Sequence, residues 1–183
     1  MSVTSKPIVF LLGPSGSGKT QLAVWVAEDL GFVNIEIDRW PEGDGIDLEG
    51  LRNEWNAFNL GQPAELASKI RKRANGGQKQ NGAVLSFPSK LVLPISIIEN
   101  AESQGFRFFI LYGTGAACLD AFLRRERQTR RELSADHWIL NNARSYAEFS
   151  RPEFSKYRLM ALGPSRHRTR GNLVAEVKRR LFE

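Results

Sequence analysis

Residues 8–20 of the chain read IVFLLGPSGSGKT. The first five are apolar and end at a glycine, a pattern typical of a buried strand in a parallel sheet. The next eight, Gly13 to Thr20, fit the spacing G-x-x-x-x-G-K-[S/T] without a mismatch. Residues 19–30 then carry apolar side chains at helical spacing and end at Gly31. Strand, loop and helix in this order predict a loop that binds the phosphates of a nucleoside triphosphate.

The residue types in this loop suit anion binding. Glycines let the backbone curve around an anion with several N–H groups pointing inward, and the helix N-terminus adds a partial positive charge. Lys19 is expected to reach the β- and γ-phosphates, and the Thr20 hydroxyl to ligate Mg²⁺. We therefore expect ATP and Mg²⁺ as cofactors. The predicted phosphate contacts are Gly13, Pro14, Ser15, Gly16, Ser17, Gly18, Lys19 and Thr20.

Size and composition set the remaining limits. The chain has 183 residues, is 42% hydrophobic and carries a net charge of +6, so we expect a single domain over residues 1–183. Its one cysteine, Cys118, excludes an internal disulfide and a zinc cluster built on cysteines. No apolar run approaches the roughly 18 residues that span a bilayer, and we expect a cytoplasmic protein without a membrane partner.

The rest of the chain alternates short apolar runs with helical patterns, which predicts an α/β fold. Five strands separated by helices indicate a parallel sheet with helices on both faces, a three-layer sandwich of the P-loop NTPase type. The expected strands are residues 8–12, 32–37, 83–87, 106–111 and 158–162. The expected helices are residues 19–30, 48–60, 64–74, 94–104, 116 into the arginines near 124, 134–149 and 172–182.

Ligands of parallel α/β sheets bind beyond the carboxyl ends of the strands. The second strand ends in Asp38, whereas the third and fourth end in Ser86-Phe87-Pro88 and Tyr112-Gly113 without an acid. Motor and transporter ATPases usually carry an acid after an apolar strand of this kind, and guanine-specific switch proteins carry Asn-Lys-x-Asp, which is absent. Both classes are therefore disfavoured.

The order of elements and the acid after the second strand resemble the small-molecule kinases of the P-loop superfamily, which include shikimate, gluconate and nucleoside monophosphate kinases. Residues 108–113, followed by residues 119–127, look like the passage that leads into the arginine-bearing lid of these kinases, here about residues 124–145. The resemblance implies an ATP-dependent phosphotransferase in which Asp38 contacts the acceptor hydroxyl or Mg²⁺. The glycine-rich triplet of shikimate kinases and the lid and acceptor signatures of adenylate kinases are missing, so the acceptor stays open.

Two groups of side chains complete the predicted site. Asp38 is the candidate for the acceptor proton and for Mg²⁺, and Arg39 could bind an anionic acceptor through its planar guanidinium. Five arginines lie between residues 124 and 131, and like charges one helical turn apart favour a bound anion. Among them, we expect Arg124 to contact the nucleotide and Arg127 to stabilise charge during transfer. Elsewhere, Trp25 and Cys118 are expected in the core, and His167 at the surface.

Two other functional classes remain open. The sequence pI near 9.8 is compatible with nucleic acid as a partner, as in a polynucleotide 5′-end kinase or an RNA-binding ATPase. The absence of a segment that mixes aromatic and basic residues makes this less favoured than a small-molecule acceptor. A regulator that binds nucleotide with little turnover is the third class.

Overall fold

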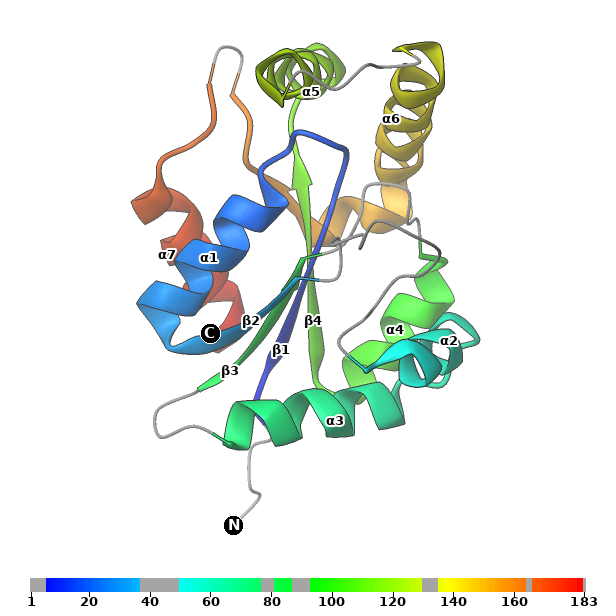
Figure 1. Ribbon diagram of the computed structural model, residues 1–183, viewed down its shortest axis with the longest axis vertical. Coiled ribbons are helices and arrows are strands. Elements are labelled where there is room, and N and C mark those ends of the chain that lie inside the picture. The colour runs from blue at the N-terminus through cyan, green and yellow to red at the C-terminus, as the bar shows by residue number, and fades with distance from the viewer. Residues whose placement is uncertain are drawn as a thin grey trace.

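The computed structural model describes residues 6–36, 50–76, 81–86, 93–129, 135–163 and 166–182. A central parallel sheet carries helices on both faces (Figure 1). Its strands, in the spatial order β2-β3-β1-β4-β5, are β1 (Ile8–Leu12), β2 (Phe32–Glu36), β3 (Gly82–Ser86), β4 (Phe106–Tyr112) and β5 (Arg158–Met160). The helices are α1 (Lys19–Leu30), α2 (Arg52–Asn59), α3 (Ala64–Asn75), α4 (Ile95–Ser103), α5 (Gly115–Thr129), α6 (Ala135–Phe149), the 3-10 helix η1 (Pro152–Tyr157) and α7 (Arg170–Phe182).

The predicted fold class is confirmed, and most elements begin and end close to their expected residues. The largest difference is α2, which begins at Arg52 rather than at residue 48, with Leu51 as its N-cap residue and no side-chain cap. β5 ends at Met160, two residues earlier than expected. Leu162 instead forms an isolated antiparallel bridge with His167. Among the described helices, none is long and apolar enough to cross a membrane.

Alternation along β1 divides the core into two layers, because successive side chains of a strand point to opposite faces. Val9 and Leu11 pack in the cluster beneath α1 and α7, which lie together on one face (Figure 1). Ile8, Phe10 and Leu12 pack in the cluster beneath the helices of the other face. All five residues of β1 are at most 1% exposed, so the run that looked like a buried strand is buried on both sides.

The strand order brings the ends of β1, β3 and β4 to one edge of the sheet. In β1, Leu11 is in register with Ser86 of β3, and Leu12 with Ile110 of β4. The chain turns from β1 toward β2 on one side and later returns to β4 on the other, and ligands bind at such a reversal of strand order. The loop after β1 and the N-terminal end of α5 both lie at this edge (Figure 1).

An aromatic cluster fixes α2 on the sheet. The Phe58 ring stacks on Phe10 with ring centroids 5.8 Å apart and on Trp55 at 5.2 Å, and it meets Phe106 at 5.4 Å in a tilted arrangement. Phe58 itself is fully buried. Aromatic pairs contribute beyond the area they bury, so this cluster anchors the short α2 despite its lack of a side-chain cap.

We predict that Phe58→Ala lowers the free energy of unfolding by about 3–5 kcal/mol, the range for removing a buried aromatic ring. Leu60→Ala is the control, because Leu60 is 80% exposed and its loss should change stability by about 0.5 kcal/mol or less. Urea unfolding followed by far-UV circular dichroism measures both variants. Equal effects of the two substitutions would contradict the anchoring role of the cluster.

Candidate functional site

The loop of residues 13–20, here called the phosphate loop, lies directly on the backbone of two neighbouring elements. A Cβ atom on Gly13 would come within 2.5 Å of the Leu111 carbonyl oxygen in β4. A Cβ atom on Gly16 would come within 2.5 Å of the Phe122 nitrogen in α5. Both glycines have positive φ angles, 138° and 80°, a region that other residues seldom adopt. These two positions therefore need glycine for both space and conformation.

Lys19 is the buried cation of the loop. It is only 8% exposed, and its Nζ donates hydrogen bonds to the carbonyl oxygens of Gly13 at 2.9 Å and Pro14 at 3.0 Å. The ammonium group is therefore folded back over the first half of the loop. Phosphate oxygens are stronger acceptors than these neutral carbonyls, since charged partners roughly double the strength of a hydrogen bond.

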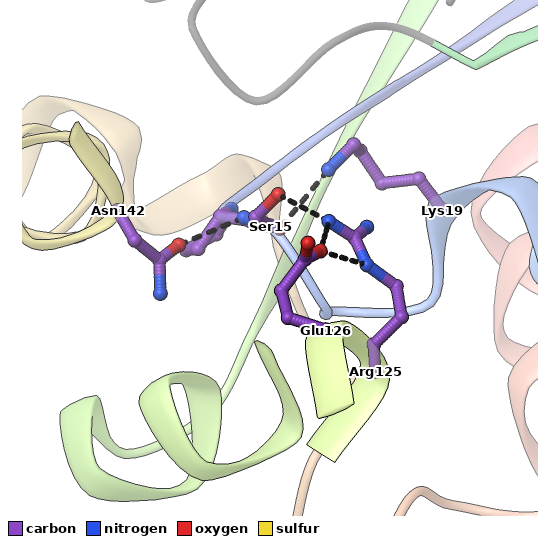
Figure 2. A network of polar contacts seen from close by, with 6 residues as sticks. Ser15, Lys19, Arg125, Glu126 and Asn142 are labelled. Atoms are coloured by element: carbon purple, nitrogen blue, oxygen red, sulfur yellow. Dashed lines mark hydrogen bonds and ion pairs between the residues drawn. The ribbon is translucent and has the colours of Figure 1, made fainter. Parts of the chain in front are cut away.

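A polar network fixes the loop to both helices that follow β4 (Figure 2). The backbone N–H of Ser15 donates to Asn142 Oδ1 in α6 at 2.8 Å, and Asn142 is 4% exposed. The Ser15 hydroxyl accepts a hydrogen bond from Arg125 Nη2 in α5 at 3.2 Å. Arg125 also donates to Glu126 Oε1 from Nε at 2.8 Å and from Nη2 at 2.5 Å. One residue of the loop is thus held from two helices.

A cavity of about 700 Å³ opens over the second half of the phosphate loop, within the size range of small-molecule sites. Its described lining includes cationic side chains and no carboxylate, so it favours an anion. An apolar part follows along α1, where Trp25 is half-buried. The lining residues are Gly16, Ser17, Gly18, Lys19, Thr20, Gln21, Val24, Trp25, Ala121, Arg124, Arg125, Gln128, Arg166, His167 and Leu173.

The structure brings part of the predicted site together. Gly16 to Thr20 and Arg124 line the cavity, and Gly13, Pro14 and Ser15 form the first half of the loop, which Lys19 and Asn142 contact. Arg127 is exposed and does not belong to the described lining, so its role stays a prediction. Asp38 and Arg39 lie outside the described residues, and their roles also stay predictions.

Other contributors were missed from the sequence. Trp25 was expected in the core; it packs against the core cluster beneath α1, but it is only half-buried and also lines the cavity. Asn142 is separated from the loop by 127 residues, and no local pattern marks it. Arg125 and Glu126 lie within the arginine-rich residues 124–131. Glu126 is the one acid among them, and it was the sequence feature that could have pointed to a paired arginine. His167 is exposed as expected, and its Nε2 lies 3.2 Å from the Gly16 carbonyl oxygen.

Cys118 behaves as the sequence suggested. It is 1% exposed and packs with Ala117, Ala121 and Leu162 behind the phosphate loop. Burial raises the pKa of its thiol to about 11, so the group stays protonated at neutral pH. It therefore takes no part as a nucleophile in the site.

No protein-family model and no curated protein sequence matches this chain. Solved structures do match it over nearly its whole length. A gluconokinase from Sinorhizobium meliloti is 16% identical, with a TM-score of 0.54, over 97% of this chain and 92% of that one. A shikimate kinase from Acinetobacter baumannii is 16% identical, with a TM-score of 0.52, over 96% and 92%. A sugar kinase from Janibacter sp. HTCC2649 is 19% identical, with a TM-score of 0.52, over 94% and 92%.

The chain therefore shares the fold of these kinase structures. The predicted resemblance is therefore confirmed at the level of the fold. A separate lid is not seen in the described residues, because residues 124–129 continue α5 and residues 135–145 belong to α6. Within the described residues, the expected lid segment of about residues 124–145 thus covers the end of α5 and most of α6.

We predict that Gly16→Ala destabilises the protein by about 2–4 kcal/mol, since it combines left-handed strain with overpacking against α5. Gly171→Ala is the matched control, because a Cβ atom there meets nothing within 4 Å and the residue lies in α7. That variant should be neutral or more stable by up to about 1 kcal/mol. Urea unfolding of both proteins measures the difference, and equal stabilities would show that α5 does not press on the loop.

Proposed function

We propose that this protein is an ATP-dependent, Mg²⁺-requiring kinase that transfers the γ-phosphate of ATP to a hydroxyl group of a small molecule. The observation that carries the proposal is the phosphate loop with buried Lys19, which opens into a cavity of about 700 Å³ whose described lining has no carboxylate. The described lining of that cavity contains four permanent cations, Lys19, Arg124, Arg125 and Arg166. A triphosphate is the ligand whose charge matches such a lining.

The polarity of the cavity suggests how ATP lies in it. Thr20 is at the first turn of α1 and Trp25 is five residues further on, a rise of about 7.5 Å along the helix. Phosphates at the loop would therefore place the ribose and base beside Trp25 and Leu173, where the wall becomes apolar. Arg124, Arg166 and His167 line the cavity as well, with His167 Nε2 3.2 Å from the Gly16 carbonyl oxygen, and would contact the nucleotide from the other elements.

The residues present fit a magnesium ion held mainly by the nucleotide. Thr20 offers a hydroxyl at the cavity wall. The described residues contain no group of three or more His, Cys, Asp or Glu side chains that could hold a metal ion by themselves. Mg²⁺ usually keeps several waters and uses one or two protein ligands besides substrate phosphates. Thr20 and Asp38 would be those ligands. When bound, the ion would neutralise the charge that develops between the β- and γ-phosphates.

Each remaining residue has a proposed role in the transfer. The acceptor oxygen attacks the γ-phosphorus, the bond to the oxygen bridging β and γ breaks, and ADP leaves. Asp38 takes the proton of the acceptor hydroxyl, and Arg39 binds an anionic group of the acceptor. Lys19 stabilises the transferring group, and Arg127 adds positive charge during transfer.

ATP consumption measured with sugars, shikimate, nucleosides and 5′-hydroxyl oligonucleotides, with and without Mg²⁺, tests the proposal. Turnover that depends on one small molecule is the expected result. Turnover only with oligonucleotides would replace the small-molecule kinase with the nucleic-acid alternative. Tight ATP binding without turnover on any acceptor would favour a nucleotide-binding regulator.

We predict that Lys19→Ala weakens ATP binding by about a hundredfold or more, since it removes charge-assisted bonds to two phosphates. Isothermal titration calorimetry measures the affinity, and circular dichroism checks that the chain remains folded. Lys178→Ala is the control, because Lys178 is exposed on α7 and does not line the cavity. A Lys19→Ala protein that retains normal ATP affinity would refute the donor site.

Asp38→Asn should lower turnover by about a hundredfold or more, the scale of a lost proton acceptor. The phosphate loop is unchanged in this variant, so ATP affinity should change much less. Steady-state kinetics with the acceptor found in the screen measures this loss, and Asp44→Asn, which changes another aspartate that follows Asp38 in the sequence, gives the comparison. Unchanged turnover in Asp38→Asn would assign the role to another acid.

A further inference from the structure

A buried carboxylate lies beside the proposed triphosphate site. Glu126 is 4% exposed on α5, and its Oε1 accepts hydrogen bonds from Arg125 Nε and Nη2 at 2.8 and 2.5 Å. The carboxylate is therefore almost fully removed from water, whereas the Arg125 side chain is 45% exposed, and a carboxylate so buried needs a charged or hydrogen-bonding partner. Without a cationic partner, the negative charge of Glu126 would repel a triphosphate bound nearby. Glu126 thus lies where its carboxylate orients the Arg125 side chain beside the phosphate loop.

Arg125 is held at the phosphate loop from several sides. Besides its bonds to Glu126, its Nη2 donates to the Ser15 hydroxyl at 3.2 Å, and its guanidinium lies 5.6 Å from the centre of the Phe122 ring. Ser15 is fixed in turn, because its N–H donates to buried Asn142 in α6. Arg125 and the loop residue it contacts are thus both held by contacts from other parts of the protein (Figure 2).

The contacts of Lys19 indicate which part of the nucleotide Arg125 would meet. Lys19 Nζ donates to the carbonyl oxygen of Pro14, the residue next to Ser15, so two cationic side chains converge on adjacent residues of the loop. The lysine of such a loop reaches the β- and γ-phosphates. Arg124, by contrast, pairs with Asp120 at 3.0 Å, with both side chains about half exposed or more.

We infer that Glu126 is a positioning residue, which holds Arg125 against Ser15 so that the guanidinium contacts the terminal phosphate of a nucleoside triphosphate. The inference rests on the proposed function and assigns Arg125, rather than a neighbouring arginine, to that contact. Because Arg125 is already ordered by Glu126, less conformational entropy is lost when the triphosphate binds. The pair should therefore favour a triphosphate over a diphosphate, which lacks the group that Arg125 meets.

The test compares the affinities for ATP and ADP, both measured with Mg²⁺ by isothermal titration calorimetry. Glu126→Gln keeps the shape of the side chain and removes its charge. We expect it to weaken ATP binding by about tenfold, on the scale of one charge-assisted hydrogen bond, while ADP affinity changes by less than about twofold. Arg125→Ala should weaken ATP binding at least as much, and the double variant should be no worse than Arg125→Ala alone, because the two residues act through one contact.

Glu148→Gln is the matched control. It removes a carboxylate from the exposed pair between Glu148 and Arg151, and neither residue lines the cavity, so both affinities should be unchanged. Should Glu126→Gln fail to fold, Arg125→Lys replaces it, because lysine keeps the charge but loses the planar fork, and it should weaken ATP binding selectively.

The outcomes separate this inference from the proposed function. Equal losses for ATP and ADP, no change in ATP affinity, or tighter ATP binding in Glu126→Gln would each overturn the positioning role. In those cases the unaltered protein still binds ATP, and the proposed function is unaffected. An unaltered protein that binds neither nucleotide would overturn the proposed function and this inference with it.

Discussion

The site depends on one constraint, the close contact between the phosphate loop and the backbone of β4 and α5. Gly13 lies against β4 and Gly16 against α5, each so close that a single methyl group would not fit. The loop is therefore part of the packed interior of the protein at its rear and open to the cavity at its front. Its curvature around an anion is set by these neighbours as well as by its own glycines.

The same constraint explains why α5 and α6 matter to a loop that comes more than a hundred residues earlier. α5 presses on Gly16, and its Arg125 reaches Ser15, while α6 holds the Ser15 amide through Asn142. The expected lid segment, about residues 124–145, therefore overlaps two helices whose side chains already contact the loop.

Local patterns of the sequence predicted the fold and the front of the site. The apolar run of β1, the glycine spacing and the helix after it lie within 23 residues, Ile8 to Leu30, and require no knowledge of distant contacts. Contacts across the chain escaped prediction. Asn142 meets Ser15 only because of how α6 packs, and the exposure of Trp25 to the cavity was missed because helical spacing alone does not distinguish a packed face from a cavity wall. The start of α2 was placed too early, at residue 48, because the local pattern does not show that aromatic stacking around Phe58 and Trp55 holds the helix.

Because Cys118 is buried on α5, the labelling of its thiol can report local opening of the protein around this helix. As the single cysteine of the chain, it sits on α5 beneath the residues that contact the loop, and its thiol stays protonated at neutral pH. An alkylating reagent can reach it only when α5 separates from the body of the protein, and such openings have free energies below that of global unfolding. The rate of labelling at this one atom would thus report how often the helix behind the phosphate loop detaches, with no engineered probe.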